Sequence, residues 1–402
     1  MDAGSRDATR RATAPATGRH SLMERRRFVT AGAALAATLP AWSPTGAAAA
    51  TRPRTVAGRL PALADVVSVL RLVADHWIGA NTDPGDNQWA RATFFSGLMA
   101  LHRLTGEPRY LSYARGWAEK HSYALNGGVT TRHADNHCAG QTYLDLYALE
   151  PEQAKIAAIE ASLRRMIAAP DGYDDWTWCD ALHMAMPPFA RLGVLRGESA
   201  FADTMHGLYT HTKSAEGGPG LYDTGSGLWY RDARFLPGGI TSPGGLPVLW
   251  SRGNGWVAAA HVKVLSALPT THRDAPEYRR TLAAGLTALR KVQRADGFWN
   301  VNLADPAHLP GPETSGTAFF TYATAYAART GLVTAGQYRP IVAGAWNGLV
   351  TTAVHPDGFL GYVQGVGDRP ESSQPVTYDT TADFGVGAFL LAGAEVAALA
   401  GT

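Results

Sequence analysis

Apolar residues recur at helical spacing through most of the chain after residue 61. One stripe runs from Asp65 to His76, and a second runs from Asn87 to Leu104. A third predicted helix ends near Lys120, and a later stripe lies within residues 181–189. No stretch alternates apolar and polar residues for long enough to predict a sheet. The pattern therefore predicts an all-α protein.

Two kinds of turn return between the predicted helices. In the first, a short polar turn places an aromatic residue in the first turn of the next helix; in the second, a glycine precedes an aromatic residue. The first kind lies at 105–110, 196–201, 273–278 and 335–338, and the second at 226–230, 296–300 and 357–361. Repeated helical hairpins indicate a toroid, and a closed ring of about six would occupy the chain after residue 61. We expect residues 62–402 to form one barrel of paired helices, with a pocket at one end.

The first fifty residues have a different composition. Three arginines at 25–27 and Phe28 precede an alanine-rich apolar run from Ala31 to Leu39, and small residues follow at Ala47–Ala50. This order is typical of a twin-arginine signal peptide. The apolar run is too short for a stable transmembrane helix. We expect a leader at 1–50, a linker at 51–61 and export to the periplasm, the cell surface or the medium, without a membrane span.

Charge and cysteine content exclude several classes of function. Residues 1–50 hold seven arginines and three acids, so the remainder carries a formal charge of −2 although the whole chain is +2. A basic nucleic-acid-binding surface is therefore not expected. Cys138 and Cys179 are the only cysteines, too few for a disulfide framework, although they could pair after export. No metal-ligand spacing occurs, so we expect no metal and no cofactor; the sequence leaves the oligomeric state open.

The stretch DDWTWCDALHMAMPPFARL at 174–192 holds the most unusual chemistry. Asp180 lies near the start of an apolar helix, beside Trp176 and Trp178. The helix dipole stabilises its carboxylate, whereas apolar burial raises its pKa. An acid beside tryptophans is typical of a sugar-binding site. The same stretch also fits a helix N-cap whose tryptophans belong to the core.

Three further polar clusters stand at the predicted starts of apolar helices. They are HADNHCAGQT at 133–142, WSRGNGW at 250–256 and ETSGT at 313–317. Each alone could be ordinary helix capping. Helices that begin in this way at one end of a barrel would direct side chains and backbone N–H groups to one place.

These residues resemble a known family. The stretches ADNHCAGQTYLDLY, DDWTWCDALHMAMPPFARLG, WSRGNGWV, DGFWNVNLADPAHLPGPETSGT and YDTTADFGVGAFLLAGAEV are similar to those of the unsaturated rhamnogalacturonyl and unsaturated glucuronyl hydrolases, glycoside hydrolase families 105 and 88. The resemblance covers the chain from about Asn87 to Val396 and implies an (α/α)6 barrel. It also implies an enzyme that hydrates the C4–C5 double bond of a terminal unsaturated uronate on an oligosaccharide.

The resemblance assigns roles to individual residues. The acid/base aspartate of the family falls on Asp180, and its second aspartate on Asp135. Arg252 and Trp256 fall on the residues expected at the sugar and its carboxylate. We also expect substrate contacts at Trp89, His137, Trp178, Arg231 and Thr314. Many members have a histidine where this chain has Arg231, which suggests a different contact there.

Other functions remain open. A conventional inverting glycosidase or a sugar epimerase could use Asp135 and Asp180 as its acid and base. A non-catalytic glycan-binding protein would use the tryptophans alone. A polysaccharide lyase is conceivable, but the cationic groove with a tyrosine or histidine base that it requires is not evident. The sequence does not identify the sugar that follows the uronate.

Overall fold

The computed structural model describes residues 58–401. Helices dominate this part of the chain. The described residues also include one pair of antiparallel strands, each two residues long. The α-helices are α1 (Leu63–Ala80), α2 (Trp89–Thr105), α3 (Pro108–Lys120), α4 (Ala134–His137), α5 (Ala139–Leu149), α6 (Ala157–Ala168), α7 (Ala181–Arg196), α8 (Ser199–Ser214), α9 (Ser251–Ala267), α10 (Ala275–Val292), α11 (Thr314–Arg329), α12 (Ala335–Gly348) and α13 (Asp383–Ala400). The shorter elements are β1 (Tyr222–Asp223), β2 (Leu228–Trp229), the 3-10 helices η1 (Gly128–Thr130), η2 (Gln153–Lys155) and η3 (Ala233–Phe235), and the π-helix η4 (Leu349–Ala353).

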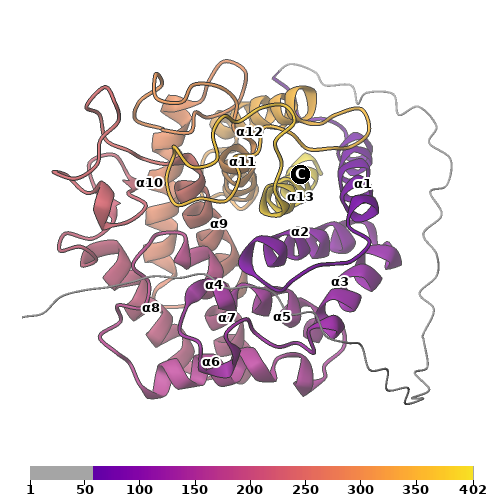
Figure 1. The fold of residues 1–402 in the computed structure, drawn as a ribbon, viewed down its shortest axis with the longest axis vertical. Coiled ribbons are helices and arrows are strands. Elements are labelled where there is room, and N and C mark those ends of the chain that lie inside the picture. The colour runs from indigo at the N-terminus through magenta and orange to yellow at the C-terminus, as the bar shows by residue number, and fades with distance from the viewer. Residues whose placement is uncertain (1–57, 402) are drawn as a thin grey trace, which may run out of the picture. The chain divides into compact units, whose positions relative to one another are not determined.

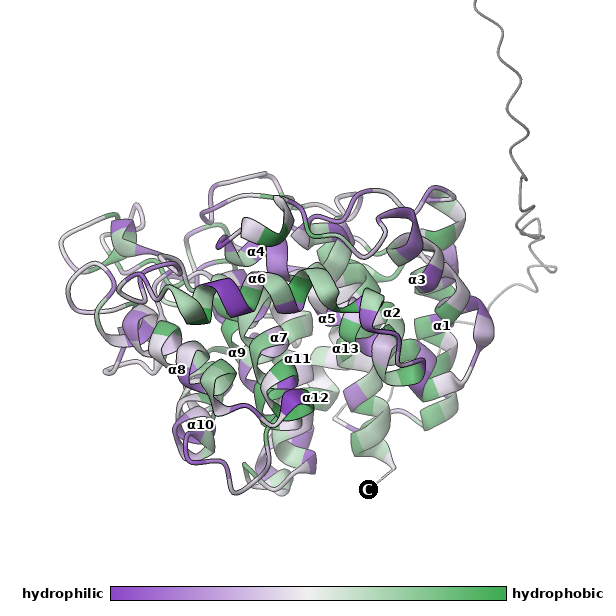
Figure 2. Cartoon of the chain, turned by 90° about the horizontal axis from the view of Figure 1, so that it is seen from below, coloured by the Kyte–Doolittle hydropathy of each residue, from purple (hydrophilic) through white to green (hydrophobic). Residues whose placement is uncertain are grey.

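The long helices form two concentric rings. Helices α2, α5, α7, α9, α11 and α13 make the inner ring: each contacts the next, and α13 returns to α2. Helices α1, α3, α6, α8, α10 and α12 lie outside it (Figure 1). Outer helices are amphipathic, as the mixed purple and green residues of α6 show in Figure 2. The predicted all-α (α/α)6 barrel is confirmed.

The inner ring closes where α13 meets α2, and two glycines make this contact possible. A Cβ atom on Gly97 would lie 2.4 Å from the carbonyl oxygen of Gly387. A Cβ atom on Gly387 would lie 2.3 Å from the carbonyl oxygen of Thr93. No real Cβ contact is so short, so only glycine lets the two backbones approach this closely.

All six inner helices point in the same direction. A cavity at one mouth is lined by residues at or near the N-termini of three inner helices, such as Trp89 of α2, Asp180 before α7 and Arg252 of α9. A second cavity, at the other mouth, is lined by residues near their C-termini, such as Arg103 of α2 and Ala267 of α9. Each outer helix carries the chain back to the first mouth, which is why polar helix starts far apart in sequence meet there.

Helix α13 is by length and composition apolar enough to cross a membrane, and is alone in this among residues 58–401. It lies in the inner ring, and 72% of its span is buried. Such burial is typical of a core helix.

Some sequence predictions concern residues that the structure does not describe. The leader at 1–50 and most of the linker at 51–61 lie outside the described residues, whereas residues 58–401 belong to a single compact unit. Cys138 and Cys179 are buried free thiols in this structure.

Replacing Gly387 with alanine is expected to destabilise the barrel by about 1–3 kcal/mol, because the new methyl group meets the backbone of α2. The matched control is Gly116→Ala in α3, where a Cβ atom would have no neighbour within 4 Å. That change is expected to stabilise the protein by about 0.5–1 kcal/mol through helix propensity. Chemical denaturation of both variants tests the contact; equal stability of the two would contradict it.

Candidate active site

A cavity of about 320 Å³ opens at the mouth where the inner helices begin. Seven of the nine predicted site residues line it, and they come from five separate segments of the chain. They are Trp89, Asp135, Trp178, Asp180, Arg231, Arg252 and Trp256, and the rest of the wall is Met184, Val366, Gly367 and Asp368. The barrel therefore assembles in one place side chains that are dispersed along the sequence.

Asp180 is the N-cap residue of α7, but its side chain does not cap the helix. Its two carboxylate oxygens have other partners: Oδ1 accepts from the thiol of Cys179 at 3.4 Å, and Oδ2 lies 3.4 Å from Nε of Arg231. The residue is only 7% exposed. An N-cap aspartate ordinarily bonds to the backbone of the first turn, so this carboxyl group is left available to the cavity.

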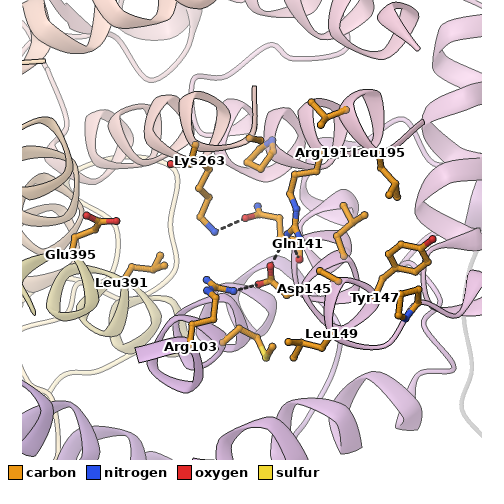
Figure 3. Close-up of a pocket in the computed structure, with 18 of the residues that line it drawn as sticks. Arg103, Gln141, Asp145, Tyr147, Leu149, Arg191, Leu195, Lys263, Leu391 and Glu395 are labelled. Atoms are coloured by element: carbon orange, nitrogen blue, oxygen red, sulfur yellow. Dashed lines mark hydrogen bonds and ion pairs between the residues drawn. The ribbon is translucent and has the colours of Figure 1, made fainter. Parts of the chain in front are cut away.

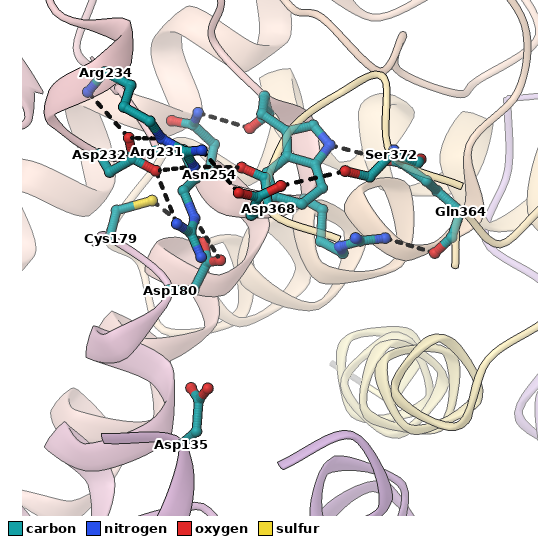
Figure 4. Close-up of polar contacts among 12 residues, drawn as sticks. Asp135, Cys179, Asp180, Arg231, Asp232, Arg234, Asn254, Gln364, Asp368 and Ser372 are labelled. Atoms are coloured by element: carbon teal, nitrogen blue, oxygen red, sulfur yellow. Dashed lines mark hydrogen bonds and ion pairs between the residues drawn. The ribbon is translucent and has the colours of Figure 1, made fainter. Parts of the chain in front are cut away.

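Burial raises the pKa of Asp180 above its ordinary value, while the charges of Arg231 and Arg252 oppose the rise. Burial also raises the pKa of Asp135, to about 6; the nearby charge of Asp180 adds to this rise and His133 opposes it. Figure 4 shows the Asp135 carboxyl group pointing toward Asp180 and Arg231. The cavity thus holds two carboxyl groups that keep a proton at higher pH than free aspartate does.

Arg252 carries a buried charge without a carboxylate partner. Its guanidinium group donates to the carbonyl oxygens of Gln364 at 2.5 Å and Gly365 at 2.9 Å. It also lies over the rings of Trp250 and Phe384, at 4.4 and 4.8 Å from their centroids. It is 1% exposed, forms no ion pair within residues 58–401, and burial lowers its pKa to about 10. Its hydrogen bonds go to neutral groups alone, while the charges of Glu313 and Asp180 oppose the fall in its pKa. A buried cation without a directly paired carboxylate favours an anionic ligand.

Arg231 belongs to a chain of alternating charges that leads away from Asp180 (Figure 4). Its Nη1 lies 2.8 Å from Asp232 Oδ2, and the same oxygen lies 2.8 Å from Nη2 of Arg234. Arg234 Nη1 then reaches Oδ2 of Asp368, also at 2.8 Å. Asp368 lies in the cavity wall. The ion pairs therefore connect the acid at the start of α7 to the 366–368 segment of the cavity wall.

Aromatic rings form the remaining walls. Trp89 and Trp256 meet edge to face with centroids 5.9 Å apart, and Phe384 packs 5.2 Å from Trp89. Trp178 is partly exposed and lies 4.9 Å from the ring of His133. Aromatic faces beside hydrogen-bonding groups are suited to a ligand that is apolar on one face and polar at its edges, as a sugar ring is.

His137 and Thr314, both predicted as substrate contacts, do not line the cavity. His137 is fully buried, and Nε2 lies 2.9 Å from Ser162 Oγ, whose hydroxyl donates to the carbonyl of Thr131. Burial lowers the pKa of His137 to about 4. Thr314, also fully buried, donates from Oγ1 to the carbonyl of Gly361 at 2.8 Å. Both side chains hold the supporting structure together, and their predicted contact with substrate is not supported.

The cavity also contains residues that the sequence analysis missed. Val366, Gly367 and Asp368 fall between the recognised stretches ETSGT and YDTTADFG. No helical stripe or polar cap marks this segment; a charged residue in a glycine-rich loop is its one local signal. Among residues 58–401 no group of three or more histidine, cysteine or acidic side chains is placed to hold a metal ion.

Comparison with known proteins identifies the family. The model of Glycosyl Hydrolase Family 88 matches residues 69–400. The unsaturated 3S-rhamnoglycuronyl hydrolase of Formosa agariphila is 28% identical over 327 residues, which cover 77% of this chain and 84% of that protein.

Two solved structures are more similar in sequence. A family 88 glycosyl hydrolase from Bacteroides vulgatus is 32% identical with a TM-score of 0.79, covering 84% of this chain and 99% of that one. The polysaccharide lyase BACCELL_00875 is 34% identical with a TM-score of 0.78, covering 84% of this chain and 97% of that one. Because the family model matches most of the barrel, the chain belongs to glycosyl hydrolase family 88.

Proposed function

We propose that the protein removes a 4,5-unsaturated uronic acid from the non-reducing end of an oligosaccharide by hydrating the C4–C5 double bond. The observation that carries this proposal is the carboxyl group of Asp180, which is buried, raised in pKa and free of the capping role that its position suggests. Family membership supports a hydrolase, and the Formosa relative is named for an unsaturated uronyl substrate.

The proposed reaction consumes one water molecule. The protonated carboxyl group of Asp180 gives its proton to C4 of the enol ether. Water then adds at C5, and a carboxylate accepts the proton that the water loses. The hemiketal at C5 then opens by breaking its bond to the ring oxygen, which leaves a ketone at C5 and a hemiacetal at C1. The hemiacetal expels the remaining oligosaccharide as an alcohol. A positioned acid of this kind contributes about 10²–10⁴-fold to the rate.

The other cavity residues suit the substrate's terminal ring. Arg252, whose charge has no carboxylate partner, and Arg231 supply positive charge for the uronate carboxylate. Asp135, with a pKa near 6, supports or directs the attacking water. A cavity of about 320 Å³ is at the small end of ligand pockets. It accommodates a terminal residue better than the interior of a long chain.

The second candidate is a polysaccharide lyase, because one solved structure with that name is 34% identical over most of the barrel. A lyase forms the C4–C5 double bond that the proposed hydrolase consumes, and it needs a base to remove the C5 proton. None of the described residues that line the cavity is a tyrosine or a histidine. The raised pKa values of Asp180 and Asp135 suit protonation of a double bond. We therefore prefer hydration of the double bond to its formation by a lyase.

We also propose that the enzyme acts outside the cytoplasm after export by a twin-arginine signal. The arginines at 25–27 and the apolar run after them support this proposal, and they lie outside the described residues. Replacing Arg25 and Arg26 with lysine should retain the protein in the producing cells.

The direction of the ultraviolet change distinguishes the two candidate reactions. The proposed hydrolase removes the absorbance of the conjugated C4–C5 double bond from unsaturated disaccharides. Asp180→Asn should lower this rate by about 10²–10⁴-fold while leaving the fold intact. The matched control is Asp171→Asn, which removes an exposed carboxylate and should keep full activity. A rise in absorbance on saturated uronate polymers would instead establish a lyase.

Arg231→Gln is expected to shift the pH dependence. The positive charge of Arg231 opposes the rise in pKa of both Asp180 and Asp135. Its removal raises both values, so the alkaline pH at which kcat/KM falls should move upward, because the acid stays protonated longer. Arg231→Lys keeps the charge, so kcat/KM should fall near the same alkaline pH as in the wild-type protein. If Arg231→Gln also left this pH unchanged, Arg231 would not set the acidity of the site.

A further inference from the structure

A second cavity, of about 790 Å³, opens at the other mouth of the barrel, where the inner helices end (Figure 3). Every inner helix contributes to its wall, and it shares no lining residue with the active-site cavity. Its volume lies within the range of small-molecule sites. The reaction proposed above assigns it no role.

Two arginines in this cavity share one carboxylate. Asp145 on α5 pairs with Arg103 of α2 at 3.2 Å and with Arg191 of α7 at 2.8 Å. Arg191 also donates to the carbonyl oxygen of Gln141. Asp145 carries one negative charge, so the trio has an excess positive charge that faces the cavity.

Lys263 of α9 adds a third cation. Its Nζ donates to Ser96 Oγ and, at 2.7 Å, to Gln141 Oε1, both of them neutral oxygens. Within residues 58–401 it forms no ion pair, and Figure 3 shows its amine directed toward Gln141 at the cavity. The other carboxylate in the wall, Glu395, is paired with Arg329 at 2.8 Å. The carboxylate charge that acts on this amine is that of Asp145, which the two arginines already share. A partly buried amine in such a position is costly to keep ionised unless a further anion joins it.

Helix dipoles do not account for this excess of charge. The inner helices place their negative ends at this mouth, which favours cations in a last turn. The outer helices begin at the same mouth and place their positive ends there: α3 starts at Pro108 after α2 ends at Thr105, and α8 starts at Ser199 after α7 ends at Arg196. The two sets of dipoles therefore oppose each other.

The remaining wall is largely apolar. It includes Met99, Leu144, Pro187 and Leu391, which surround the cationic side chains. We propose that this cavity is a second binding site, for a small organic carboxylate whose anionic group meets Lys263, Arg103 and Arg191 and whose apolar body contacts these walls. The site is independent of the proposed hydrolase activity, because it lies at the opposite mouth.

Methionine methyl resonances can report on the two cavities separately. The chain has seven methionines, of which Met99 lines the second cavity and Met184 the active-site cavity. Protein labelled with ¹³C at the methionine methyl groups would be titrated with benzoate and with benzamide, its neutral counterpart. We expect benzoate to shift the Met99 resonance saturably and benzamide to have an at least tenfold weaker effect. Any shift of Met184 would report separately on benzoate in the active-site cavity.

A pair of variants tests the role of Lys263. Lys263→Gln should weaken benzoate binding about tenfold, since it removes one charge-assisted hydrogen bond. Lys291→Gln, which removes an exposed lysine of α10, should leave binding unchanged. An unshifted Met99 resonance in the wild-type protein, or equal binding by benzoate and benzamide, would overturn the proposal. Equal binding by the two variants would overturn the part assigned to Lys263.

The wild-type protein offers a test that needs no substitution. Burial lowers the pKa of Lys263 to about 8, so benzoate affinity should fall as the pH rises through that value. The facing groups keep their charge state over this range: Arg103 has a raised pKa, Asp145 a lowered one, and burial keeps Tyr322 neutral. The other facing groups are Arg191, which is paired with Asp145, and Glu395, whose pKa burial raises while the charge of Arg329 opposes the rise. An affinity that is unchanged across this range would contradict a role for the charge of Lys263.

Discussion

The common direction of the six inner helices is the constraint on which the rest of the structure depends. It follows from the hairpin connectivity, and the ring closes between Gly97 and Gly387, where a larger side chain would meet the facing backbone. One mouth therefore gathers the helix starts, with their polar and glycine-rich caps, and the other gathers the helix ends. The chemistry of each mouth is a consequence of which helix ends are brought together there.

At the first mouth, the decisive feature is a competition over the charge of Asp180. Burial favours the protonated carboxyl group, and the two arginines favour the carboxylate. Because the two effects oppose each other, the carboxyl group suits the role proposed for it, which is to give a proton and then receive one. Arg231 is itself held by Asp232, so the position of the charge beside Asp180 is fixed by the ion pairs that run on to Asp368. The wall segment at 366–368 and the acidity of the site are in this way physically connected.

Much of this arrangement could be predicted from sequence because its signals are local. The apolar stripes marked the helices, and the polar caps placed Asp135, Asp180, Arg252 and Trp256 at helix starts, where the structure has them. The resemblance then assigned their roles.

What could not be predicted depends on tertiary packing. His137 shares the same cap as Asp135, yet it faces the opposite way and bonds to Ser162. The 366–368 segment has no periodicity to mark it. Arg103, Arg191 and Lys263 stand on three different inner helices, and only closure of the ring brings them to one cavity.

In the proposed reaction the chemistry occurs at C4 and C5 and leaves the anomeric carbon out of the first steps. The most direct measurement compares the turnover of two unsaturated glucuronides that differ only in an oxygen or a sulfur atom between C1 and the aglycone. Hydration of the double bond predicts that both are consumed at similar rates, since neither protonation at C4 nor addition at C5 involves that atom. If the oxygen-linked compound were consumed and the sulfur-linked one were not, hydration of the double bond would be contradicted. Acid-assisted cleavage at C1 would then be indicated.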